Sequence, residues 1–189
     1  MNPLIDYFKK YRSLDSDTEN KLNAIIKIII KQKGDYFLKQ GQVVSGIGII
    51  QSGSARAYYI KDDIEICTWF SFENDIITST LPLSFNQPSL ENIQFLELSV
   101  IYFIPKDDLN ELYAHSPIMN IIGRKFAEEY CKVLEERINS LQTESAEQRY
   151  KSLVNKQPQL LQRVALGYIA SYLGITQETL SRIRKKVQF

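Results

Sequence analysis

The side chains best suited to chemistry lie near the C-terminus, between Leu166 and Lys186. Four of them carry hydrogen-bond donors or acceptors at steps of one, three or four residues: Gln177, Glu178, Ser181 and Arg182. In a helix this spacing puts them on one face, where Gln and Arg can make paired hydrogen bonds to base edges in a DNA major groove. Four more suit phosphate groups: Thr176, Arg184, Lys185 and Lys186. The segment therefore has side chains that could read DNA.

The neighbouring residues predict the scaffold that such a helix needs. Two apolar faces are spaced for a pair of packed helices: Ile169, Ala170 and Leu173, then Leu180 and Ile183. Gly174 lies between them, where a tight turn needs a positive φ. Thr176 is a good N-cap for the second helix, with Glu178 in its first turn, where the helix dipole favours a carboxylate. The pattern predicts a helix-turn-helix.

The charge distribution supports the same interpretation. Residues 145–189 hold eight Lys or Arg and two Glu, a net charge of +6, and residues 1–144 hold the other 15 basic and 20 acidic residues, a net charge of −5. An electropositive module favours a polyanion through phosphate neutralisation and counterion release. The alternative is a basic, solvated surface on an ordinary helical hairpin. The combined apolar, Ala, Gly and polar positions favour DNA binding over that alternative.

The composition is that of a folded protein. A chain of 189 residues with 44% hydrophobic and 24% charged residues suits one substantial domain plus a small one. Cys67 and Cys131 lie far apart in apolar sequence, so we expect buried free thiols. No apolar run is long enough to span a membrane, and the N-terminus has no signal pattern. We expect a cytoplasmic protein without a membrane partner.

The whole chain is expected to be α+β, with its strands in the first part, residues 1–117. Leu4, Ile5 and Phe8 mark a helical entry, and a capping box at 16–19 should open a helix whose apolar positions are Leu22, Ile25, Ile26 and Ile29. Short β-rich runs follow between turn residues: Tyr36–Leu38, Gly46–Ile50, Ala55–Ile60, Ile64–Phe70, Ile93–Leu98 and Val100–Ile104. Such closely spaced strands predict an antiparallel sandwich or barrel.

Two helices are predicted next, a short one over Asp107–Tyr113 and, past Ser116-Pro117, a long one to about Gln142. Apolar residues recur in the long helix every three or four positions: Ile118, Ile122, Phe126, Tyr130, Leu134, Ile138 and Leu141. This stripe could pack on the β-domain or on a second copy of the helix. The length of the helix favours a homodimer, with Phe126 to Leu141 as its interface. A second capping box, at 145–148, should open the C-terminal module.

The order of these parts resembles the Crp/Fnr family of bacterial transcription regulators. The residues that carry the resemblance are the turn at Gly41, the segments Ile50–Arg56 and Phe72–Asp75, and above all Tyr168–Arg184. The resemblance implies a sensory, cyclic-nucleotide-binding-like β-roll (a double-stranded β-helix or jelly-roll) over 1–117, a central dimerisation helix over 118–144 and a DNA-binding domain over 145–189. It also implies that Gln177, Glu178 and Arg182 touch bases.

The effector site departs from the family pattern. Members that bind cyclic AMP hold its ribose with a Gly-Glu pair and its phosphate with an Arg-Ser or Arg-Thr pair. The corresponding places here are Thr78-Ser79 and Ser89-Leu90, and no Lys or Arg occurs between Lys61 and Lys106. A buried phosphate diester needs a cation or several N–H donors. We therefore predict a degenerate pocket that does not bind cyclic nucleotides.

Other sensory chemistries of the family find little support in the composition. An iron–sulfur cluster needs about four thiolates, and the chain has two cysteines. His115, the sole histidine, precedes Ser116-Pro117 at a helix end, which suits a surface or capping residue better than a haem ligand. We expect no metal and no cofactor. The effector is either a neutral or weakly polar small molecule or absent, and RNA polymerase is a further partner that the resemblance allows.

Two other functions compete with a regulator that binds double-stranded DNA. The first is a ligand-binding or protein-interaction module without a DNA role, which the basic C-terminal part disfavours. The second is a metal-dependent jelly-roll enzyme, which would need clustered histidines or carboxylates. No catalytic Ser/His/Asp set or nucleotide fingerprint is recognisable, so we predict no enzyme. Family members usually continue into a β-hairpin wing, whereas the sequence stops at Phe189, so phosphate contacts are expected from Arg184 to Lys186 and from Arg149 or Arg163.

Overall fold

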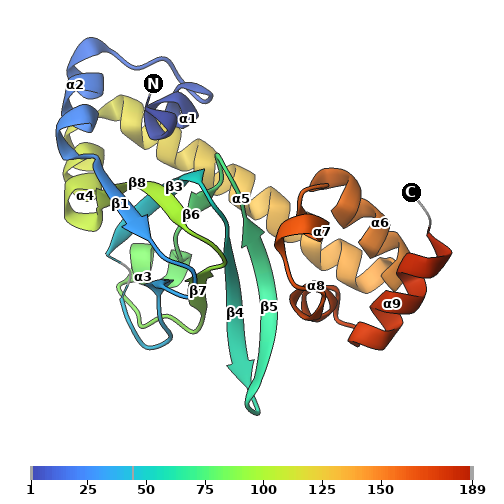
Figure 1. The fold of residues 1–189 in the computed structure, drawn as a ribbon. Helices are drawn as coiled ribbons and strands as arrows, with labels where there is room; N and C mark the ends of the chain where they lie inside the picture. The colour runs from blue at the N-terminus through green and yellow to red at the C-terminus, as the bar shows by residue number, and fades with distance from the viewer. Residues whose placement is uncertain (1, 44, 188–189) are drawn as a thin grey trace. The chain divides into compact units, whose positions relative to one another are not determined.

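The computed structural model describes residues 2–43 and 45–187; Gln188 and Phe189, the end of the predicted DNA-binding domain, lie outside them. Its helices and strands follow one another as Figure 1 shows. The first half contains α1 (Pro3–Lys9), α2 (Ser16–Ile25), β1 (Lys27–Lys31), β2 (Tyr36–Leu38), β3 (Gly46–Ser52), β4 (Ala55–Lys61), β5 (Ile64–Ser71), β6 (Ile76–Ile77), α3 (Thr80–Phe85) and β7 (Asn92–Phe95). The second half contains β8 (Ser99–Pro105), α4 (Lys106–His115), α5 (Pro117–Thr143), α6 (Ala146–Lys156), α7 (Leu160–Arg163), α8 (Leu166–Leu173) and α9 (Gln177–Lys186).

The strands form two four-stranded sheets, ordered β1-β8-β3-β6 and β2-β7-β4-β5. In the first sheet β8 pairs antiparallel with β1, from Lys27 opposite Phe103 to Lys31 opposite Ser99, and antiparallel with β3. Apolar residues from both sheets meet in one buried cluster: Leu38, Ile50, Ala55, Ile77, Ile93, Phe95 and Ile101. The predicted α+β class with antiparallel strands and a long central helix is confirmed.

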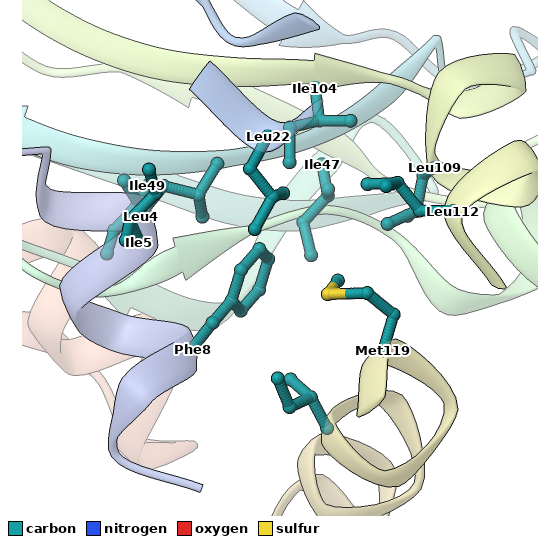
Figure 2. Packing of buried hydrophobic residues seen from close by; sticks show 11 residues of the cluster. Leu4, Ile5, Phe8, Leu22, Ile47, Ile49, Ile104, Leu109, Leu112 and Met119 are labelled. Atoms are coloured by element: carbon teal, nitrogen blue, oxygen red, sulfur yellow. The ribbon is translucent and has the colours of Figure 1, made fainter. Parts of the chain in front are cut away.

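A second buried cluster joins the N-terminal helices to the first sheet. It collects side chains from α1, α2, β3, β8, α4 and α5, most of which Figure 2 labels: Leu4, Ile5, Phe8, Leu22, Ile47, Ile49, Ile104, Leu109, Leu112, Met119 and Ile122. Removing a side chain of this size from water contributes about 1.5–3 kcal/mol. The cluster fixes the start of α5 on the β-domain, so the apolar residues at that end of the predicted stripe, such as Ile122, are buried within one chain.

The predicted helix through Ile29 was wrong at its end. Helix α2 ends at Ile25, Ile26 is extended, and Lys27–Lys31 form strand β1. Ile28 and Ile30 are 60% and 65% exposed while Ile29 packs against the core between the sheets, which is the alternation of a strand. Three successive β-branched residues favour a strand, and the pairing with β8 supplies hydrogen bonds that decide the outcome.

Several smaller predictions also need correction. The N-cap of α2 is Asp15, whose Oδ1 accepts a hydrogen bond from the N–H of Thr18 at 2.7 Å, so the helix is not opened by a capping box at 16–19. That hydrogen bond lowers the pKa of Asp15. Strand β7 ends at Phe95 rather than near Leu98, and β6, α3 and α7 were not predicted. Cys131 is exposed on α5, whereas Cys67 is buried as expected.

The described residues divide into two compact units. The first comprises 2–43, 45–57 and 70–130, and the second comprises 58–69 and 131–187. In the second unit, helices α6 to α9 surround the C-terminal part of α5 (Figure 1). The capping box predicted at the start of α6 is present, because Ser145 accepts from the N–H of Gln148 and the Gln148 side chain accepts from the N–H of Ser145. None of the helices in the described part of the chain is long and apolar enough to cross a membrane.

Candidate nucleic-acid interface

The two helices predicted near the C-terminus form a helix-turn-helix. Helix α8 ends at Gly174, whose φ of +68° is the left-handed value that a glycine adopts without strain. The hydroxyl of Thr176 then accepts a hydrogen bond from the N–H of Thr179 at 3.2 Å and caps α9. Four buried side chains join the helices: Ile169, Ala170, Leu173 and Leu180. Both the predicted turn and the predicted N-cap are confirmed by this geometry.

The face of α9 opposite Leu180 carries the four side chains predicted to contact bases. Gln177, Glu178 and Arg182 are exposed, and Ser181 is half-buried. One Arg182 nitrogen lies 3.4 Å from the Thr179 hydroxyl, a long contact that leaves most of the guanidinium available to a partner. Hydrogen bonds from its own backbone N–H and from Thr176 lower the pKa of Glu178. The structure therefore brings together two donor side chains, a hydroxyl and an ionised carboxylate.

The residues predicted to hold phosphates have different surroundings. Arg184 and Lys185 are exposed in the last turn of α9. The Thr176 hydroxyl is occupied as the helix cap. The ammonium of Lys186 lies 2.8 Å from a carboxylate oxygen of Glu147, in the first turn of α6. A phosphate would therefore have to compete with Glu147 for Lys186.

Two arginines hold the end of α8, and the sequence analysis missed this role for both. Arg149 on α6 donates to the carbonyl of Leu173 at 3.0 Å, so this predicted alternative phosphate ligand is engaged inside the unit. Arg137 on α5 donates to the carbonyl of Tyr172, and its guanidinium stacks on the Tyr172 ring at 3.8 Å. Burial lowers the pKa of Arg137. Cations at a helix C-terminus are favoured by its dipole, so the pair positions the helix that supports α9.

The predicted dimer stripe of α5 is only partly exposed. The Phe126 ring packs edge-on against Tyr7, with ring centroids 6.5 Å apart. The other four residues of the predicted interface are more exposed: Tyr130 (37%), Leu134 (37%), Ile138 (55%) and Leu141 (47%). Large apolar side chains at this spacing form a continuous exposed ridge. The exposed ridge therefore begins at Tyr130.

The predicted effector residues fall into two groups. Ser79 and Ser89 are buried beside Glu91, a residue that the sequence analysis did not select. The Ser79 hydroxyl donates to a Glu91 carboxylate oxygen at 2.8 Å, and the Ser89 hydroxyl donates to the Glu91 carbonyl at 2.8 Å. Thr78 instead donates to the carbonyl of Gly46, and Leu90 is 59% exposed. Ser79 thus bonds the Glu91 carboxyl and Ser89 bonds the Glu91 backbone, and burial raises the pKa of Glu91.

Two cations in the same unit are engaged by other groups. Arg56 is buried and donates twice to the Gln94 side chain, at 2.9 and 3.3 Å. Lys106 donates to the carbonyl of Pro82 and to the Asn86 side chain, at 3.0 and 3.2 Å. His115 is exposed, with its Nδ1 3.0 Å from the carbonyl of Glu111, as a residue at a helix end. Among the described residues, no group of three His, Cys, Asp or Glu side chains is placed to hold a metal ion.

The comparisons with known proteins agree with this architecture. Residues 30–116 match the model of the cyclic nucleotide-binding domain. The fumarate and nitrate reduction regulatory proteins of Yersinia pestis and Escherichia coli are each 27% identical to the chain over 186 residues, covering 90% of the chain and 74% of the relative.

Solved structures share the fold. A transcriptional regulator of the Crp/Fnr family from Eubacterium rectale superposes with a TM-score of 0.74 at 17% identity, covering 96% of this chain and 87% of that one. FixK2 from Bradyrhizobium japonicum gives a TM-score of 0.73 at 14% identity, covering 86% and 84%. The chain therefore shares the fold of these Crp/Fnr regulators, and its residues 30–116 match a cyclic nucleotide-binding domain.

Proposed function

We propose that the chain is a homodimeric, sequence-specific DNA-binding transcription regulator that does not respond to cyclic nucleotides. The observation that carries the proposal is the exposed face of α9, where Gln177 and Arg182 lie opposite the buried Leu180. A bidentate Arg suits guanine and a bidentate Gln suits adenine. The surrounding C-terminal sequence, with a net charge of +6, supplies the attraction to phosphate that positions such a helix.

Selection from a random double-stranded DNA library with the full chain tests this function. We expect an enriched motif made of two half-sites about one helical turn apart, roughly 34 Å, because a two-fold dimer presents two reading helices. The enriched duplex should bind more tightly than a scrambled duplex of the same length at equal salt. Equal binding of both duplexes would contradict sequence-specific recognition and leave only attraction to phosphates.

Dimerisation is expected to depend on the exposed ridge of α5. Leu134→Glu places a carboxylate at the centre of the ridge in both copies, where association would bury it without a partner. We expect the dimer dissociation constant to rise about 100-fold or more, because an uncompensated buried charge costs about 3–5 kcal/mol. Analytical ultracentrifugation over a concentration series measures the change.

Asn139→Glu is the matched control for that substitution. Asn139 lies five residues after Leu134, on the other side of α5, and receives the same change from neutral to negative. The control should sediment as the unaltered chain does. A chain that is monomeric at micromolar concentration before any substitution would remove the basis for the dimer.

Cyclic AMP and cyclic GMP are expected not to bind. Glu91 and two serines occupy the place of the predicted pocket, and the cations Arg56 and Lys106 are hydrogen-bonded elsewhere. An ionised Glu91 would repel the cyclic phosphate. Isothermal titration calorimetry with up to about 1 mM nucleotide should give no binding heat. A dissociation constant of about 1 mM corresponds to a binding free energy of only about −4 kcal/mol. As a control, the same preparation must bind DNA, which shows that it is folded. A one-to-one binding isotherm for either nucleotide, with a dissociation constant in the micromolar range, contradicts the prediction.

A small-molecule effector stays a prediction, with an orphan regulator as its alternative. Among the described residues, none accepts a hydrogen bond from the side-chain nitrogen of the buried Asn92, next to Glu91. A buried side-chain donor suits a ligand that accepts a hydrogen bond.

A further inference from the structure

One carboxylate of the C-terminal unit is shared by two lysines. Glu147, in the first turn of α6, has one carboxylate oxygen 2.9 Å from the ammonium of Lys151 and the other 2.8 Å from the ammonium of Lys186. Lys151 is one turn further along the same helix, whereas Lys186 is 39 residues away, in the last turn of α9. The contact therefore connects the helix that presents the base-reading residues to the start of α6.

The charges at this contact resemble those of a phosphate contact. A carboxylate offers two oxygens and a full negative charge to ammonium groups, as a DNA phosphate does. The two lysines lower the pKa of Glu147 to about 2, so the carboxylate stays ionised at any pH at which the protein would meet DNA. The three side chains have a net charge of +1, whereas the two lysines alone would have +2.

We propose that Glu147 is an intramolecular phosphate mimic that occupies Lys186 and Lys151 and thereby lowers the affinity of the protein for DNA. The inference rests on the proposed DNA-binding function and adds a residue that sets its strength. A DNA phosphate that approaches the end of α9 must displace Glu147 from Lys186, and it also experiences repulsion from the same carboxylate. Glu147 thus reduces the part of binding that is independent of sequence, and it leaves the contacts of Gln177 and Arg182 with bases unchanged.

Glu147→Gln tests the proposal, because it removes the charge and keeps the shape. The full chain is titrated with a fluorescent mixed-sequence duplex of about three helical turns at several salt concentrations. We expect the variant to bind more tightly than the unaltered protein at low salt. The slope of log Kobs against log salt should steepen by about 0.9 for each lysine that gains a phosphate, and hence by up to about 1.8.

Glu136→Gln is the matched control, since Glu136 also lies near two lysines, at 3.9 Å from Lys132 and 3.5 Å from Lys156, but near none on α9. It accounts for the loss of one negative charge anywhere in the unit. The gain from Glu147→Gln should exceed that of the control, and it should shrink when Lys186 is replaced by Ala. Circular dichroism checks that each variant keeps its helices.

The outcomes separate this inference from the proposed function. If the unaltered chain binds the duplex but Glu147→Gln and Glu136→Gln change the slope equally, Glu147 has no special role and the inference is wrong. The inference is also overturned if Glu147→Gln weakens binding with its helices intact, since the ion pair would then serve to position α9. If the unaltered chain binds no DNA at any salt concentration, the proposed function itself fails.

Discussion

Gly53→Ala is expected to destabilise the β-domain more than most single substitutions do. Gly53 lies between β3 and β4 with a φ of +105°, a conformation that side chains rarely adopt. A Cβ built there would lie 2.2 Å from the Ser99 hydroxyl oxygen and 2.7 Å from the Ser99 Cα, which is backbone. Strain of about 1–2 kcal/mol and a forced backbone shift of about 1–3 kcal/mol add to a loss of about 2–5 kcal/mol in the free energy of unfolding.

Gly41→Ala separates the two causes. Gly41 has a similar φ, +84°, but a Cβ there would have nothing within 4 Å, so only the conformational strain remains. We expect a loss of about 1–2 kcal/mol for this control. Urea unfolding followed by the fluorescence of Trp69, the single tryptophan, measures both variants. Equal losses would mean that Ser99 moves away at little cost and that the contact does not constrain the turn.

The turn at Gly53 is an example of a local feature that can be predicted from the sequence. The motif around Gly53 is structural, since Ile50 and Asn74 are joined by a backbone hydrogen bond of 2.8 Å and the N–H of Gly53 donates to Glu73 at 2.9 Å. Such local requirements restrict which residue types can occur at a turn, and strand alternation likewise restricts where apolar residues occur, so both can be recognised in the sequence. Strand β1 could not be assigned this way, because a run of Ile fits both periods until its pairing with β8 is known.

In the candidate interface, too, the features that depend on local sequence could be predicted, whereas the contacts between distant residues could not. The face of α9 follows from helical periodicity alone, so Gln177 and Arg182 were predictable. The contacts of Glu147 with Lys186 and of Arg137 with Tyr172 join residues 39 and 35 positions apart. Neither contact has a local pattern. Glu91 was missed for another reason: the resemblance directed attention to Ser89-Leu90, whereas the carboxyl that bonds Ser79 follows one residue later.

Arg182→Ala is expected to change which DNA sequence the protein prefers. Arg182 is exposed on the face of α9 and has a guanidinium suited to the two acceptors of guanine in the major groove. Its loss should cost about 1–3 kcal/mol on the preferred site and flatten the preference at one base pair. Arg182→Lys keeps the charge but lacks the planar fork, so it should retain the salt dependence and lose the preference.

Lys185→Ala should have the opposite effect. Lys185 is exposed in the last turn of α9, whereas Lys186 is held by Glu147, so Lys185 is the clearer test of a phosphate contact. We expect binding to weaken equally for all sequences and the salt slope to fall by about one. Selection from the random library with each variant, followed by salt titrations, measures both quantities. A selected motif that is the same with and without Arg182 means that another face of α9 contacts the bases, even if the protein binds DNA tightly.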